Sequence, residues 1–261
     1  MKIFDSHCHL DDPCYDPDRP AVLQRAADAG VAAMMIVGTD LASSGKAVRL
    51  AVENSGCCCA SVGVHPHDAK ACSNSVLAGL RRLAQAENVR AWGEIGLDFN
   101  RMYSPQADQE NWFVRQLEVA RELSLALIFH ERDSGGRFID LLREHADAGL
   151  RGVIHCFSGT RAELDHYLDL GLYVGITGIL TIKQRGAALR ELVRTIPADR
   201  LLVETDAPYL TPTPERNHTR RNEPAFVRTV LLKLAEVRQD DPALLSETIW
   251  NNTCRLYGIE P

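Results

Sequence analysis

Short apolar, β-rich runs alternate with longer stretches of helical periodicity along the whole chain, and this alternation limits its possible folds more than any other feature. A helix between two strands carries the chain back to the starting edge, so consecutive strands run parallel. Each run is short enough to be a buried strand bounded by turn residues. We expect strands near residues 2–7, 33–38, 59–64, 89–95, 125–130, 152–157, 172–177 and 201–206.

The segments between these runs carry apolar residues at helical spacing. In 106–123, for example, Trp112, Phe113 and Leu117 form much of one apolar side, with charges interleaved. Repeated strand–helix units within 261 residues fit an α/β fold, a closed (β/α)8 barrel of the TIM type, as a single domain over 1–261. We expect helices near 20–30, 43–55, 75–86, 106–123, 135–147, 161–170 and 186–195, followed by 222–238 and 243–256.

Side chains that can bind metal occur at the predicted C-terminal ends of the strands. A barrel brings these ends onto one rim, so residues far apart in sequence would converge there. A doubly wound open sheet is the alternative, but it normally binds its ligand at one switch point, so a spread over five strands favours closure. The residues are His7 and His9 on the first strand, Glu94 on the fourth, His130 on the fifth, His155 on the sixth and Asp206 on the eighth.

This ligand set indicates two metal ions. Histidines two residues apart on a strand share a face and are close enough to bind one cation. Six ligands exceed the three or four that one four-coordinate zinc takes from protein, so a pair of metals is expected. Histidines suit zinc or manganese, and carboxylates suit magnesium or manganese. The natural division gives one metal His7, His9 and Asp206, and the other His130 and His155, with Glu94 as the bridge.

Paired metals promote hydrolysis by lowering the pKa of a bound water and by holding the attacking and leaving oxygens about 4 Å apart. Asp206 can ligate a metal and accept the proton of that water, so Asp206 and Glu94 are the expected catalytic residues. His65 lies at the third strand end and is expected to orient substrate or bind an anion. Glu204 shares a face with Asp206, either supporting a ligand or pairing with a cation inside the barrel.

Composition narrows the function further. A formal net charge of −6 excludes a broad basic surface that coats nucleic acid, but not a phosphate held in a metal site. A basic cluster follows the last predicted strand, where a loop can meet an anionic substrate or simply be solvated; it consists of Arg216, His218, Arg220 and Arg221.

Met1 leads directly into an apolar strand, and no apolar run reaches about 18 residues, so we expect no signal peptide, no membrane span and a cytoplasmic protein.

Eight cysteines without a secretory signal are expected to remain thiols. Cys8 and Cys156 adjoin expected ligands, but alternation along a strand directs each away from its neighbouring histidine. Thiolate ligation of the metals is therefore the less favoured alternative.

The motifs that hold these residues resemble those of the TatD family of metal-dependent deoxyribonucleases, within the amidohydrolase-like barrels. They occur in order along nearly the whole chain, so the match is specific. Glu131 departs from the family pattern, but it should point off the ligand face. The matching runs are DSHCHL at 5–10, GVHPHD at 63–68, GEIGLDFNR at 93–101, FHERD at 129–133, HCFSGT at 155–160, YVGITG at 173–178, ETDAPYL at 204–210 and RRNEPA at 220–225.

The resemblance implies a TIM-like barrel, a divalent-metal site and removal of nucleotides from DNA ends, typically 3′ to 5′ with a preference for single strands. By position, Arg221 and Asn222 fall in the family's RxNEP-like loop and are expected to bind substrate. The residues that match its metal-binding positions are His7, His9, Glu94, His130, His155 and Asp206.

Two other functions stay open at this stage. A metal-dependent amidohydrolase or esterase, acting for example on an aminoacyl ester, uses the same paired-metal chemistry. Only the subtype with a carbamylated bridging lysine is excluded, because Glu94 stands at that position. A non-catalytic metal-binding protein would not need the complete ligand set. We expect no membrane and no obligate protein partner, and the choice between DNA and RNA and the oligomeric state are left open.

Overall fold

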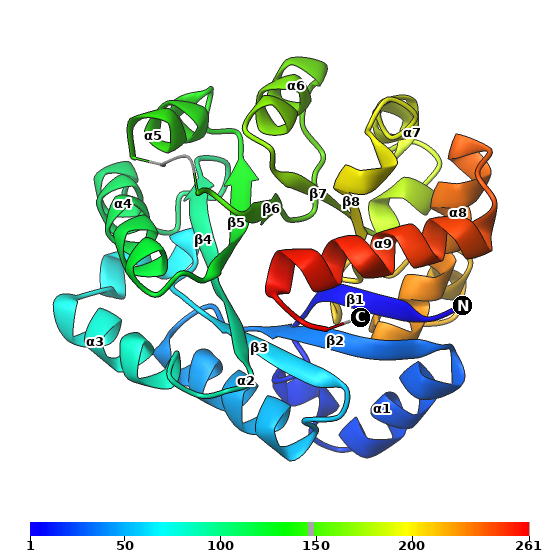
Figure 1. Ribbon diagram of the computed structural model, residues 1–261, viewed down its shortest axis with the longest axis horizontal. Coiled ribbons are helices and arrows are strands. Elements are labelled where there is room, and N and C mark those ends of the chain that lie inside the picture. Colours follow the sequence, from blue (N-terminus) through cyan, green and yellow to red (C-terminus); the bar gives the residue numbers. More distant parts are fainter. Residues whose placement is uncertain (146–148, 261) are drawn as a thin grey trace.

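The computed structural model describes residues 1–145 and 149–260 and confirms the expected (β/α)8 architecture. Figure 1 shows the strands inside a ring of helices. Every neighbouring pair in the sheet is parallel, in sequence order. The strands are β1 (Ile3–Cys8), β2 (Val31–Val37), β3 (Cys58–Val62), β4 (Val89–Asp98), β5 (Ala126–Arg132), β6 (Gly152–Ile154), β7 (Tyr173–Ile176) and β8 (Leu201–Val203).

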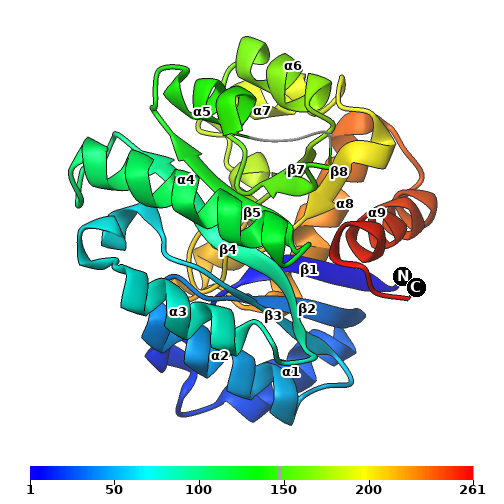
Figure 2. The same ribbon diagram turned by 60° about the vertical axis from the view of Figure 1, so that its left-hand side comes forward.

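The helices cover the outer side of the strands, as Figure 2 shows for α2 to α4 along β3 to β5. Within the described residues, no helix combines the length and the apolar character that crossing a membrane requires. Of the predicted helix 135–147, residues 146 and 147 lie outside the described residues. The helices are α1 (Arg19–Asp28), α2 (Leu41–Glu53), α3 (Asn74–Leu83), α4 (Gln106–Glu122), α5 (Arg137–His145), α6 (Arg161–Asp169), α7 (Ala187–Leu192), α8 (Val227–Arg238) and α9 (Pro242–Tyr257).

The barrel is closed by backbone hydrogen bonds between the end of β1 and the segment that follows β8. The backbone N–H of His9 donates to the carbonyl of Ala207 at 2.7 Å, and the N–H of Asp206 donates to the carbonyl of His7 at 2.9 Å. These bonds join the first strand to the segment after β8. Closure therefore brings His7 and His9 directly beside Asp206.

The barrel interior is apolar at its N-terminal end. All eight strands contribute to one inner cluster, which includes Phe4 of β1 and Ile128 of β5. Trp250 and Tyr257 of α9 pack against Phe4, with ring centroids 5.7 and 6.0 Å away. Helix α9 therefore seals this end, and the polar residues of the interior gather at the opposite, C-terminal end.

Two irregularities turn expected ligands into the barrel. In β4, Ala91 belongs to the inner cluster and Ile95 to the outer one, although regular alternation would put both on the same face. The pairing with β5 shifts between Trp92 and Ile95, and this reverses the alternation so that Glu94 faces inward. In β1, a shift between Asp5 and Cys8 has the same effect.

The expectation that every ligand closes its strand is wrong in detail. Strand β4 continues to Asp98 and β5 to Arg132, so Glu94 and His130 lie inside strands. Strands β6 and β8 end at Ile154 and Val203, because the chain leaves the ladder before reaching the next ligands. Helix α8 begins at Val227 rather than 222, since a short 3-10 turn, Pro224–Phe226, precedes it.

Gly96→Ala tests the close approach of β4 to β5. Gly96 has φ +149°, and an added Cβ would overlap the carbonyl oxygen of His130. We predict that the free energy of unfolding falls by about 2 kcal/mol or more, measured by chemical denaturation. Gly56→Ala is the control, because a Cβ there meets nothing within 4 Å. Equal stabilities of the two variants would contradict the role given to Gly96.

Candidate metal centre

Glu94 lies at the middle of the polar cluster in the barrel mouth. Its Oε2 is 3.4 Å from His7 Nε2, and its Oε1 is 2.8 Å from His130 Nδ1. The two oxygens of one buried carboxylate thus face histidines from opposite parts of the rim. Burial raises the pKa of Glu94, but the surrounding histidines outweigh burial and hold the pKa well below its usual range.

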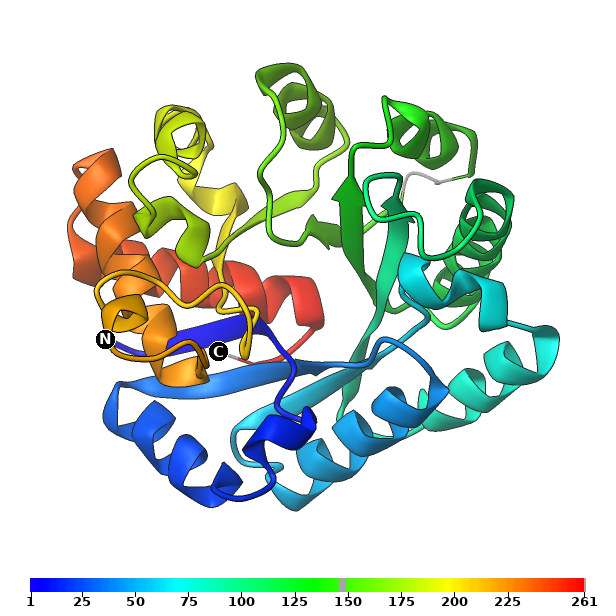
Figure 3. The same ribbon diagram turned by 180° about the vertical axis from the view of Figure 1, so that it is seen from behind.

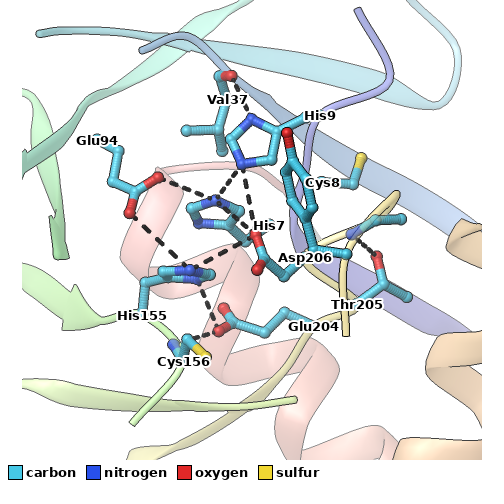
Figure 4. Close-up of polar contacts among 12 residues, drawn as sticks. His7, Cys8, His9, Val37, Glu94, His155, Cys156, Glu204, Thr205 and Asp206 are labelled. Carbon is cyan, nitrogen blue, oxygen red and sulfur yellow. Dashed lines mark hydrogen bonds and ion pairs between the residues drawn. The ribbon is translucent and has the colours of Figure 1, made fainter. Parts of the chain in front are cut away.

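Asp206 faces the same space from the other side, as Figure 4 shows. Its Oδ1 lies 3.4 Å from His9 Nε2 and 3.7 Å from both His7 Nε2 and His155 Nε2. Burial raises the pKa of Asp206, but His155 and the hydrogen bond to His9 outweigh burial and lower the pKa below its ordinary value. The carboxylate is therefore ionised. The residue has φ 57°, a conformation that aspartate tolerates better than most residues.

Polar contacts on the far nitrogens of His9 and His155 fix which nitrogen of each ring faces the cluster. His9 Nδ1 donates to the carbonyl of Val37 at 3.1 Å, which leaves Nε2 facing Asp206. His155 Nδ1 lies 2.9 Å from Glu204 Oε1, so its Nε2 faces inward. Metal-binding histidines are commonly oriented in this way by a carboxylate or carbonyl on the second nitrogen.

His130 is oriented by Asp98, a residue that the sequence analysis missed. Asp98 Oδ2 lies 3.2 Å from His130 Nε2 and 2.8 Å from His67 Nε2. The buried carboxylate also accepts the backbone N–H groups of Asn100 and Arg101 on Oδ1. Because Asp98 accepts from Nε2, His130 Nδ1 is free to face Glu94. Asp98 lies four residues after Glu94 on β4, and residues an even number apart on a strand share a face. This spacing could have indicated Asp98 from the sequence.

His65 has the opposite arrangement. Its Nδ1 accepts the backbone N–H of His67 at 3.0 Å, so the ring proton must be on Nε2. That nitrogen points to Glu94 Oε1 at 3.5 Å and to His130 Nδ1 at 3.2 Å. Burial and the charge of His130 lower the pKa of His65 to about 4. His65 is therefore a neutral hydrogen-bond donor. Ring nitrogens of His65, His67 and His130 lie within 4.8 Å of one another, but His65 Nε2 carries the proton and offers no lone pair to a metal.

Glu204 lies beside His155, one of the expected ligands. Besides its approach to His155, its Oε1 accepts the backbone N–H of Cys156 at 2.6 Å, and its Oε2 accepts the hydroxyl of Ser6 at 3.2 Å. A Cβ at Gly175 would lie 2.6 Å from Glu204 Oε2, so the small residue makes room for the carboxylate. Glu204 is completely buried.

The thiols beside the ligands point elsewhere. Cys8 Sγ donates to the carbonyl of Met35, and Cys156 Sγ lies 3.6 Å from Thr177 Oγ1. All eight cysteines fall within the described residues and are free.

The spacing of the donor atoms fits a divalent cation. His7 Nε2 and His9 Nε2 are 3.3 Å apart, and the inward-facing nitrogens and oxygens around Asp206 are 3.4 to 3.7 Å apart. Ligands at about 2.1 Å from one ion with tetrahedral angles are about 3.4 Å from each other. Neutral histidine nitrogens and ionised carboxylates are the donors that such ions bind.

Arg221 and Asn222 make their contacts with other residues of the chain rather than with the expected ligands. Both guanidinium NH2 groups of Arg221 pair with Asp18 at 2.7 Å, so a direct contact with substrate would require this ion pair to open. Asn222 is fully buried, and its Nδ2 donates to the carbonyls of Thr205 and Tyr209. Both side chains therefore hold the loop after β8 in place rather than facing the metal-binding cluster.

A parallel barrel with histidines and carboxylates gathered at the C-terminal end of its strands defines a metal-dependent barrel hydrolase. The family model for TatD-related DNases matches residues 4–258, and the chain belongs to that family. Relatives named 3′-5′ ssDNA/RNA exonuclease TatD include one from Rahnella sp., 44% identical over 98% of each chain. A second, from Citrobacter koseri, is 42% identical over 98% of this chain and 99% of its own. Among solved structures, the TatD homologue YJJV of Escherichia coli has a TM-score of 0.90 at 29% identity, covering 99% of this chain and 98% of its own.

Metal binding should strengthen as pH rises. Burial lowers the pKa of the histidines, but carboxylates outweigh burial and raise the pKa of His9 and His130 to about 9 and of His155 to about 10. In the metal-free protein these protons must leave before an ion binds. We predict a gain of about tenfold or more in apparent affinity per pH unit between about pH 6 and pH 8. Titration against a chelator measures it, and a pH-independent affinity would contradict the ligand assignment.

Asp98→Asn tests the orientation of His130. The amide keeps the size of the side chain, but its NH2 group can no longer accept from both His130 and His67. Loss of such a supporting carboxylate typically weakens metal affinity about 10- to 100-fold. Metal titration with circular dichroism on the same sample checks this, and Asp133→Asn is the control in the neighbouring loop. Unchanged metal affinity would show that Asp98 does not position the ligand.

Proposed function

We propose that this protein is a divalent-metal-dependent 3′→5′ exonuclease that hydrolyses phosphodiester bonds at single-stranded DNA ends, with single-stranded RNA as a further substrate. The observation that carries the proposal is the convergence of all six expected ligands around Glu94 and Asp206 in one buried cluster. The exonuclease names of full-length relatives support the polarity and the single-stranded substrate.

Two ions are proposed, and Mg²⁺, Mn²⁺ or Zn²⁺ suit the mixed donor set. When bound, the ions polarise a phosphoryl oxygen and lower the pKa of the attacking water. Glu94 would bridge the two, because its oxygens face separate histidines. His155 approaches both carboxylates: its Nε2 lies 3.7 Å from Asp206 Oδ1 and 3.9 Å from Glu94 Oε1. One ion would be held by His7, His9 and Asp206, and the other by His130 and His155, both of which approach Glu94 Oε1.

Asp206 would accept the proton of the attacking water on its carboxylate. The low pKa keeps this group ionised and ready to accept, and its 15% exposed side chain reaches the open mouth of the barrel. His65 would donate its Nε2 hydrogen to a phosphate oxygen, because its tautomer is fixed and the ring stays neutral. Arg221 and Asn222 would contribute to substrate binding by holding the loop after β8.

Asp206→Asn tests this function. The amide cannot accept the proton, so we predict a fall in the rate on 3′-terminal single-stranded DNA of about 10²- to 10⁴-fold, and more if metal is lost. End-labelled oligonucleotides report rate and polarity, and metal analysis reports occupancy. Asp199→Asn, exposed at the opposite end of the barrel, is the control.

Two results would contradict the proposal. More than a tenth of the wild-type rate with full metal occupancy in Asp206→Asn would place the base elsewhere. A wild-type protein that hydrolyses a panel of esters but no oligonucleotide would make the chain a different metal-dependent hydrolase.

A further inference from the structure

Two large aromatic side chains are exposed on the loops that surround the metal centre. Tyr103, between β4 and α4, and Tyr209, between β8 and α8, each have 55% of their surface exposed. Exposed apolar surface next to a polar candidate site is a common mark of a ligand contact. Neither residue has a part in the metal-binding cluster described above.

Each tyrosine is in contact with a histidine at the edge of the cluster. The Tyr103 ring is 4.8 Å from the His67 ring, at an interplanar angle of 72°. The Tyr209 ring is 5.9 Å from the ring of His9, at 67°. Tyr209 therefore packs against an expected ligand, and Tyr103 is separated from His130 by the side chain of His67. Both tyrosines keep more than half of their surface exposed.

The backbone of both loops is held in place. The N–H of Tyr209 donates to the carbonyl of Asp206 at 2.8 Å, and its carbonyl accepts from Asn222. Beside Tyr103, the hydroxyl of Ser104 donates to the carbonyl of His67, and the carbonyl of Ser104 accepts from Gln109. The aromatic surfaces are thus presented from positioned loops, which lowers the entropy lost on binding.

The two loops lie on opposite sides of the opening. Strands β4 and β8 are half a turn apart in a barrel of eight strands in sequence order. In Figure 3 the gold segment after β8 lies to the left and the green segment after β4 to the right. The metal-binding cluster lies between them, because Glu94 comes from one side and Asp206 from the other.

We propose that Tyr103 and Tyr209 form two stacking platforms, one for the base on each side of the scissile phosphate. This inference rests on the proposed nuclease function and explains its preference for single strands. Unpaired bases can turn outward and stack on aromatic rings, whereas bases in a duplex are already stacked and paired. Stacking accepts every base because each has a π-face, so the platforms would bind DNA ends without sequence preference.

Alanine and phenylalanine variants of each tyrosine test the proposal on a single-stranded oligonucleotide. Tyr103→Ala and Tyr209→Ala should each raise KM about tenfold, with kcat changed less, because a stacked base is lost. Tyr103→Phe and Tyr209→Phe should restore the wild-type KM, because they keep the ring. Leu244→Ala on α9, where the side chain is 66% exposed, is the control and should leave KM unchanged.

Oligonucleotides with an abasic site at the terminal or the penultimate position identify each platform. The KM effect of one Tyr→Ala variant should disappear on the terminal abasic substrate, and that of the other on the penultimate one. Alanine variants that lose as much on both abasic substrates as on intact DNA, or that keep the wild-type KM while the wild type degrades DNA, overturn the inference alone. A wild-type enzyme that leaves the oligonucleotide intact overturns the proposed function and this inference together.

Discussion

A buried carboxylate surrounded by histidines is the interaction on which the rest of this structure depends. Glu94 is 3% exposed, and its two oxygens face His7 and His130 from within a barrel that is otherwise apolar below it. An ionised carboxylate in such a place is costly unless charge or hydrogen bonds compensate it. The histidines supply this compensation without metal, and bound cations would supply it more strongly.

The surrounding residues set the direction of each nitrogen. A carbonyl orients His9, and carboxylates orient His130 and His155, so one ring nitrogen of each faces the cluster. His65 is turned the other way by one backbone N–H and becomes a donor. The same kind of side chain thus serves as ligand or as hydrogen-bond donor, depending on one contact on its far nitrogen.

The fold and the gathering of histidines and carboxylates at one end of the barrel could be predicted from the sequence, because strand and helix periodicity and the residues near strand ends are local signals. The pairing shifts that turn His7 and Glu94 inward could not be, since they depend on how neighbouring strands align. The ion pair of Arg221 with Asp18 joins residues more than 200 positions apart, and no local pattern predicts it. Asp98 was missed for a different reason: it stands in the run GEIGLDFNR at even spacing from Glu94, but the contact with His130 that orients the ring comes from another strand.

We propose that the carboxylate of Glu94 bridges two ions, one on the side of His7 and His9 and one on the side of His130. Anomalous diffraction from crystals loaded with Mn²⁺ tests it directly, because each bound ion gives its own peak. If Glu94 bridges the ions, two peaks about 4 Å apart should lie on either side of its carboxylate. The first should lie beside His7, His9 and Asp206, and the second beside His130. A single peak, or a second peak that Glu94 does not contact, would contradict it.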